Sequence, residues 1–284
     1  MSIMDQPVAS FQQHAPERIS NPLQPGDETD AIWQAIRDSA EKVSQREPLL
    51  RQRLFKLVLN QTTLAATMAA VLASRLACSD MPEQELYALI QEMFEQDAVI
   101  LPRTAADLAA VKARDPACLE YLHVLLNLKG FHALQTYRIA NALWRKQREE
   151  LALALANQAS LMFAVDIHPA ARIGAGVMLD HGTGIVIGET TVVDDNVSIL
   201  QNVTLGGTGN EHGDRHPKIR GGVMIGAGAK ILGNIEVGTM SKVAAGSVVL
   251  KNVPPHCTVA GVPARVVRHH QEGRCPSVDM NQAL

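Results

Sequence analysis

Residues 219–253 read IRGGVM-IGAGAK-ILGNIE-VGTMSK-VAAGSV-VLKNV, with an aliphatic side chain at the head of each group of six. In such a repeat each hexad supplies a short strand and a tight corner, three hexads make one coil, and each coil buries the apolar face of the next. The same period starts upstream, with a shift of two after Leu179 and an irregular stretch after Leu205. It predicts a parallel β-helix. The aliphatic heads are Ile167, Ile173, Leu179, Ile187, Val193, Ile199, Leu205, Ile219, Ile225, Ile231, Val237, Val243 and Val249.

The distribution of aromatic residues and glycine divides the chain into two domains. All ten Phe, Tyr and Trp residues lie at or before Phe163, whereas 18 of the 20 glycines lie among the last 121 residues. A thin prism has no room for rings and needs glycine at its corners. Residues 30–163 are instead rich in helix-favouring residues, with apolar side chains three and four apart. We therefore predict an α+β chain: an all-α domain at 30–163, a β-helix domain at 164–260 and a C-terminal tail at 261–284.

Several helix boundaries can be predicted within the helical domain. The pair Asp115-Pro116 has the form of a helix start, a capping carboxylate followed by Pro at the first helical position. The apolar pattern predicts helices at 62–77, 82–98, 104–113 and 129–159.

Bulk composition narrows the functional class. Residues 1–29 hold several Pro and Gln and no apolar core of a secretory signal, so we expect a disordered extension. The net charge of −3 and the lack of a Lys/Arg stripe argue against a nucleic-acid partner. No apolar run is long enough for a membrane helix, and the four scattered cysteines suit a reducing compartment. We expect a soluble cytoplasmic protein.

Polar side chains stand where the period of six breaks. Residues 206–218 cannot be absorbed into a coil and are predicted to project as a loop. Asp166 and His181 are 15 residues apart, close to one coil of 18, so they could be neighbours on adjacent coils. An Asp behind a His fixes the tautomer of the ring and suits it for general-base work. The charged groups at the breaks are Asp166, His168, Asp180, His181, Arg215 and His216.

Blander interpretations stay open for these residues. A single His on a solenoid corner is often only exposed. His212 and His216 are four apart, a zinc-ligand spacing on a helix, but Gly and Pro in this loop oppose a helix. The glycine-rich turn at 206–209 could approach a phosphate or simply form the flexible base of the loop.

Several motifs together resemble bacterial serine O-acetyltransferases of the hexapeptide-repeat acyltransferase superfamily. The resemblance covers roughly residues 30–280. Hexads alone would indicate only the superfamily, whereas the polar motifs ahead of and within the coils are more specific. The motifs are Lys129-Gly-Phe-His-Ala-Leu-Gln135, Asp166-Ile-His-Pro-Ala170, Leu179-Asp-His-Gly-Thr-Gly184, Gly188-Glu-Thr190, Val203-Thr-Leu-Gly-Gly-Thr208, Asp214-Arg-His-Pro-Lys-Ile219 and Gly261-Val-Pro-Ala-Arg265.

The resemblance implies a left-handed β-helix and transfer of acetyl from acetyl-CoA to the hydroxyl of L-serine, the first step of cysteine biosynthesis from serine. It implies direct transfer without a metal or an acyl-enzyme, with His181 as general base and Asp166 as its partner. The serine ammonium is expected at Asp115 and Asp180, and its carboxylate at Arg215 and His216. The acetyl-CoA contacts that it implies are Gly207, Thr208, Ala227 and Ala245.

The resemblance also implies partners. Family members are inhibited by L-cysteine in the serine site and assemble as a dimer of trimers through the helical domain. Their longer tail ends in an Ile that docks into O-acetylserine sulfhydrylase. This chain ends at Leu284, which leaves that complex open. Two other functions remain alternatives: an acyltransferase acting on a sugar or antibiotic hydroxyl, and a zinc hydratase or scaffold of the same fold.

Overall fold

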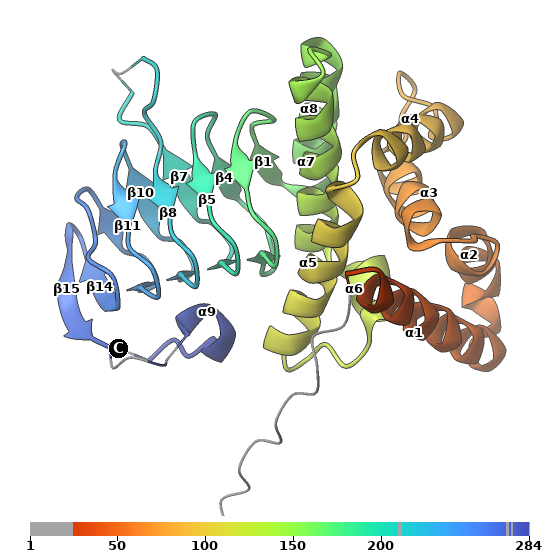
Figure 1. Ribbon diagram of the computed structural model, residues 1–284, viewed down its shortest axis with the longest axis horizontal. Coiled ribbons are helices and arrows are strands. Elements are labelled where there is room, and N and C mark those ends of the chain that lie inside the picture. Colours follow the sequence, from red (N-terminus) through yellow and green to blue (C-terminus); the bar gives the residue numbers. More distant parts are fainter. Residues whose placement is uncertain (1–24, 210–211, 271–272, 274, 284) are drawn as a thin grey trace, which may run out of the picture.

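The computed structural model describes residues 25–209, 212–270, 273 and 275–283 (Figure 1). Most of the predicted N-terminal extension, 1–24, lies outside the described residues, as does Leu284. A helical domain is followed directly by a β-helix, which confirms the predicted fold class. The helices are α1 (Pro25–Arg46), α2 (Arg51–Leu54), α3 (Leu64–Leu76), α4 (Glu83–Gln96), α5 (Ile100–Arg114), α6 (Tyr121–Asn127), α7 (Lys129–Arg145), α8 (Glu149–Phe163) and α9 (Pro276–Asp279), with a 3₁₀ turn at Pro48–Leu50 and a π turn at Phe55–Leu59.

The helix predicted at 129–159 is two helices. The chain leaves α7 at Lys146, passes through Gln147 in a left-handed conformation (φ 61°) and enters α8 at Glu149, so that α8 packs back against α7. The segment holds no Gly or Pro, the usual signals of a helix end, and the apolar pattern continues across it. The break was therefore invisible in the sequence.

The β-helix consists of three parallel sheets around an aliphatic interior. All thirteen hexad heads are buried, at 5% exposure or less, and they stack in register. One ladder runs through Ile167, Ile187, Leu205, Ile231 and Val249. The sheets are β1-β4-β7-β10-β13 (Val165–Ile167, Ile185–Ile187, Thr204–Gly206, Lys230–Leu232, Val248–Val249), β2-β5-β8-β11 (Arg172–Ile173, Val192–Val193, Lys218–Ile219, Glu236–Val237) and β3-β6-β9-β12-β14-β15 (Met178–Leu179, Ser198–Ile199, Met224–Ile225, Lys242–Val243, Cys257–Gly261, Ala264–His269).

Three edges run along this prism, each built from stacked corners. We name them the His181 edge, the loop edge and the helix edge. The His181 edge holds corners 180–184, 200–203, 226–229 and 244–247. The loop edge holds corners 168–171, 188–191, 207–217 and 233–235. The helix edge holds corners 174–177, 194–197, 220–223 and 238–241.

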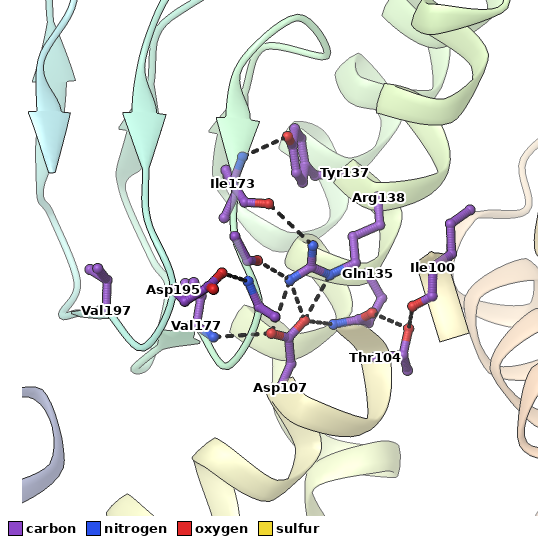
Figure 2. A network of polar contacts seen from close by, with 12 residues as sticks. Ile100, Thr104, Asp107, Gln135, Tyr137, Arg138, Ile173, Val177, Asp195 and Val197 are labelled. Atoms are coloured by element: carbon purple, nitrogen blue, oxygen red, sulfur yellow. Dashed lines mark hydrogen bonds and ion pairs between the residues drawn. The ribbon is translucent and has the colours of Figure 1, made fainter. Parts of the chain in front are cut away.

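The helix edge docks on the helical domain through a buried polar network (Figure 2). Asp107 of α5 accepts two hydrogen bonds from Arg138 of α7, of 2.8 and 2.9 Å, and one of 2.8 Å from Gln135. The same carboxylate accepts the backbone N–H of Val177, and Arg138 donates to the carbonyl of Gly174, both in the first coil. Because every charged group is bonded, the network tolerates full burial and fixes both helices on the coil.

The C-terminal tail lies across the sheet that contains β6 and β12. Ser198 donates to the carbonyl of Ser277 at 2.8 Å, and the buried Lys242 donates to the carbonyl of Asn281 at 3.1 Å. The outer face of this sheet is thereby covered by the chain's own tail.

Candidate active site

The predicted pair Asp180-His181 occupies a corner of the His181 edge. His181 has a left-handed backbone (φ 57°), and its side chain is 72% exposed, so the ring stands out from the prism. Its Nε2 lies 3.8 Å from Oδ1 of Asp180. Burial of the Asp180 carboxyl raises its pKa, and the nearby Asp115 carboxylate adds to the rise while His181 opposes it. The corner thus combines an imidazole with two neighbouring carboxyls.

The helical domain fixes this corner by a close backbone approach. A Cβ on Gly130, in the first turn of α7, would lie 2.0 Å from the carbonyl oxygen of Leu179. Glycine is therefore required for α7 to reach the residue that precedes Asp180. Gly182 lies on the other side of the corner with φ +76°, and Lys129 donates a hydrogen bond to Thr183. The Lys129-Gly130 motif thus positions the corner that carries His181.

Asp115 reaches the site from the end of a helix, and the predicted helix start at Asp115-Pro116 is wrong. Asp115 is the C-cap of α5, and its Oδ1 accepts the N–H of Ala117 at 2.9 Å, which closes a turn that leads away from α5. The preceding Arg114 donates to Oγ of Ser198 at 3.1 Å and to Oδ1 of Asn196 at 3.3 Å. These bonds fix the end of α5 on the β-helix. A carboxylate followed by Pro also favours a turn, and Asp115-Pro116 forms a turn here.

His216 lies on a different edge, the loop edge, and is buried. Its Nδ1 accepts hydrogen bonds from the hydroxyl and the N–H of Thr190, at 2.8 and 3.2 Å. Burial lowers the pKa of His216, and the adjacent Arg215 adds to the decrease. The neutral ring therefore carries its proton on Nε2, as a hydrogen-bond donor. A Cβ on Gly188 would lie 2.1 Å from Cδ2 and Nε2 of His216, so the ring packs directly on this glycine.

Arg215 is held beside His216. Its Nη2 donates to Oε2 of Glu189 at 2.6 Å, Nη1 donates to the carbonyl of Gly213 at 3.1 Å, and its backbone N–H donates to Thr190 Oγ1 at 3.0 Å. The hydrogen bond from Arg215 holds the pKa of the Glu189 carboxyl below its usual range. The motif Gly188-Glu-Thr190 contributes to the family resemblance, but the sequence alone predicted no role for Glu189 or Thr190. Their position in a polar corner directly after a strand was the available signal.

Asp166 and His168 lie beside one another at the first coil. Asp166 is on β1, paired with Val186. Burial lowers the pKa of His168, while the charges of Glu189 and Asp166 act in the opposite direction. The His168 ring packs edge-on against Trp144, with 5.2 Å between the ring centroids. Among the bonds that the described residues make, none joins Asp166 to His181. The predicted Asp166–His181 pairing stays a prediction.

The four residues predicted to contact acetyl-CoA divide between the same two edges. Ala227 and Ala245 are stacked on the His181 edge, where the N–H of Gly246 donates to the carbonyl of Ala227 at 2.8 Å. Gly207 and Thr208 lie at the base of the projecting loop on the loop edge. The β4 strand separates the two edges by four residue steps, about 13 Å. Each edge of one chain therefore carries only half of the predicted residues.

Metal-ligating clusters, disulfides and membrane-spanning helices can be assessed in the described part of the chain. No three His, Cys, Asp or Glu side chains there gather as a metal site would need, and the four cysteines are free thiols. None of the helices among those residues is both long and apolar enough to cross a bilayer.

The stacked hexad coils and their two polar corners define an acyltransferase of the hexapeptide-repeat class. Residues 32–136 match the family model described as serine acetyltransferase, N-terminal. The serine acetyltransferase of Salmonella typhimurium is 52% identical over 258 residues, which cover 91% of this chain and 94% of that protein. The chain belongs to the serine acetyltransferase family.

Solved structures agree with this assignment. The crystal structure of the Vibrio cholerae serine acetyltransferase superposes with a TM-score of 0.88 at 54% identity and covers 90% of this chain and 98% of that one. A serine acetyltransferase in complex with cysteine gives a TM-score of 0.88 at 51% identity, over 90% of this chain and 99% of the other. The Brucella abortus serine acetyltransferase in complex with coenzyme A gives 0.85 at 50% identity, over 86% and 98%.

Proposed function

We propose that this enzyme transfers the acetyl group of acetyl-CoA to the hydroxyl of L-serine, releasing O-acetyl-L-serine and CoA. The observation that carries the proposal is the pairing of an exposed imidazole and two carboxyls on one edge with an arginine and a neutral histidine on another. Serine is a zwitterion, so its site needs fixed charges of both signs. The relatives named serine acetyltransferase, and the coenzyme A complex of one of them, support this proposal.

The carboxyls suit the serine ammonium. Asp115 and Asp180 repel one another electrostatically, and Asp180 is already disfavoured as an anion by burial. An ammonium group between them would relieve both effects, because an opposite charge stabilises ionised carboxylates. Arg215 and the Nε2–H of His216 would receive the serine carboxylate with charge-assisted hydrogen bonds. Glu189 orients Arg215 for this contact at 2.6 Å.

His181 is proposed as the general base. It would take the serine hydroxyl proton as the hydroxyl oxygen bonds to the thioester carbonyl carbon, and the C–S bond would then break. The departing CoA thiolate would recover the proton from the imidazolium, so protons and charge balance. Asp166 is proposed to orient the ring, with Asp180, at 3.8 Å, as the nearest carboxylate in the free enzyme.

A complete site is proposed to form between copies of the chain. The His181 edge of one copy would meet the loop edge of the next, which brings Ala227 and Ala245 opposite Gly207 and Thr208 for acetyl-CoA. A cyclic trimer provides this heterologous contact, and the helical domain would join two trimers. In this arrangement neither edge is a site without its neighbour.

L-Cysteine is proposed as an inhibitor of the same site. It carries the ammonium and carboxylate of serine and replaces the hydroxyl with a thiol, so the same charges would bind it. One relative has been solved in complex with cysteine. The sulfhydrylase complex remains an expectation; here the backbone of the tail is bound to the chain's own Ser198 and Lys242.

The test of the reaction is the release of CoA thiol from acetyl-CoA with a panel of acceptors. Release with L-serine, inhibited by L-cysteine, supports the proposal, and release only with sugars or amines would sink it. His181→Ala should abolish most of the activity. A variant that keeps it would remove His181 from the mechanism while leaving the acceptor assignment intact.

The shared site has its own test in mixed oligomers. His181→Ala damages one edge and Arg215→Gln the other, so each variant alone should be inactive. In oligomers formed from an equal mixture, about a quarter of the contacts join an intact His181 edge to an intact loop edge, because each edge is intact in half of the copies. Activity should return to about that fraction of wild type. No recovery in proven hetero-oligomers would show that each site lies within one chain.

A further inference from the structure

A groove with a volume of about 880 Å³ runs along the outer face of the β2-β5-β8-β11 sheet, where the helical domain meets the coils. It touches the loop edge at Ala170, but its lining contains none of the residues proposed for the acetyl-transfer site. Its end at the helical domain is lined by Arg103 of α5, by Tyr137, Trp144 and Arg145 of α7, and by Arg172 of β2. Figure 2 shows Tyr137 and Ile173 on the two sides of this junction.

Two of the three guanidinium groups in the groove, those of Arg103 and Arg172, are not bonded directly to a carboxylate within the described parts of the chain. Arg145 forms an ion pair with Asp97 and donates to Oδ1 of Asn141 at 3.1 Å. Arg103 and Arg172, by contrast, make no side-chain hydrogen bond or ion pair within the described parts of the chain. Both are positively charged at any physiological pH. Arg103 acts electrostatically on Asp97, and Arg172 acts on Asp214, but these carboxylates are bonded to Arg145 and Lys218. The N–H donors of Arg103 and Arg172 are therefore available to an anion.

The acidic residues that line the groove, Asp194 and Asp195, form no ion pair with Arg103 or Arg172 in the described parts of the chain. Asp194 lies 3.7 Å from Nη1 of Arg220, which also pairs with Glu236. Oδ1 of Asp195 accepts the N–H of Ala175 at 2.7 Å, a bond that belongs to the helix edge. Both carboxylates have partners of their own.

Part of the floor of the groove leaves room for a ligand because its residues there are small. Ala170 and Gly174 lie next to Arg172, and Gly221 continues the floor. A Cβ on Gly174 would lie 2.3 Å from Oδ1 of Asp195, so glycine is required at this point of the floor. The half-buried Trp144 provides an aromatic surface beside the cationic groups.

We infer that this groove binds the phosphate or sulfate group of a small metabolite between Arg103 and Arg172. A tetrahedral dianion has enough acceptor oxygens for two guanidinium forks, each of which can donate two parallel hydrogen bonds. The remainder of the ligand would lie along the small-residue floor against Trp144. Arg145 adds positive potential without giving up Asp97.

Calorimetric titration of the full-length enzyme tests the inference, with inorganic phosphate and sulfate as separate probes at an ionic strength matched with chloride. Each titration is run without CoA and again with saturating CoA, which occupies the acetyl-transfer site. We expect binding of at least one dianion, weakened at least about tenfold in Arg103→Gln and in Arg172→Gln. Lys146→Gln removes an exposed cation outside the groove and should bind as wild type does.

Equal binding in the two arginine variants and wild type would overturn the inference, as would heats no larger than those of chloride. Loss of dianion binding on addition of CoA would overturn a separate site. Neither arginine side chain makes a structural bond, so both variants should fold, which thermal unfolding checks. These readouts need no acetyl transfer and leave the proposed function untouched if they fail.

Discussion

Gly188→Ala is a small change with a large expected effect on serine binding. The new methyl carbon would lie 2.1 Å from Cδ2 and Nε2 of His216 and 2.9 Å from Cε1. Carbon atoms in contact prefer about 3.5–4.0 Å, so the ring has to move by more than 1 Å. The backbone of Gly188 does not itself require glycine, since its φ is not positive. The variant therefore tests the packing of His216 and little else.

The displaced ring loses two hydrogen bonds from Thr190, of 2.8 and 3.2 Å. A neutral hydrogen bond contributes about 0.5–1.5 kcal/mol, so the free energy of unfolding should fall by about 1–3 kcal/mol. The Nε2–H should also leave the position where it would meet the serine carboxylate. A hydrogen bond to a charged group is worth about 1.5–3 kcal/mol, which corresponds to a loss of at least about tenfold in kcat/KM for serine.

Steady-state kinetics with each substrate varied in turn measure this loss, and urea unfolding measures the stability. We expect kcat/KM to fall for serine while the KM for acetyl-CoA stays within about twofold. Gly221→Ala is the matched control, because a Cβ there meets its nearest atom at an ordinary 3.4 Å and lies on a different edge. Wild-type kcat/KM for serine in a folded Gly188→Ala variant would refute the role given to His216.

Three further predictions test the fold. Asp107→Asn leaves Arg138 buried without its counter-ion and should cost about 3–5 kcal/mol in urea unfolding. Arg145→Gln removes a guanidinium that is itself exposed and should cost less, about 1 kcal/mol. Burial lowers the pKa of His132 to about 4, so as pH falls the unfolded chain binds the proton before the folded one does. The contribution of this histidine to the free energy of unfolding should be complete above pH 6.5 and fall by about 3 kcal/mol towards pH 4. His132→Gln should remove this pH dependence. Ile225→Phe forces a ring into the prism and should destabilise it by about 1–3 kcal/mol or more, and a wild-type melting temperature would contradict the thin interior.

The repeat was predictable because its physics is local. Each hexad head must be aliphatic to stack on the residue one coil away, so a period of six in the sequence becomes a ladder in space. The shift of two after Leu179 marked the corner of His181, and the irregular stretch after Leu205 marked the loop. Counting hexads would even have assigned these departures to different edges, since the first follows the third strand of a coil and the second follows the first strand.

The rest depended on contacts that no local pattern encodes. Glu189 and Thr190 hold residues 26 positions further on, across a loop of irregular length. Asp115 lies near Asp180 at the end of α5, which Arg114 bonds to the second coil, more than 80 residues later. The left-handed turn at Gln147 is stabilised by the packing of α8 on α7, which the helical pattern cannot distinguish from one long helix.

The coils differ in length without any change in their core. Ile187 and Leu205 are 18 residues apart and Leu205 and Ile231 are 26 apart, yet all three pair in the same register. Extra residues are therefore accommodated entirely at a corner, outside the aliphatic ladder. The prism is therefore a constant scaffold. The loop segment that recognises the acceptor could be replaced by one of another length and sequence without a change in the aliphatic core.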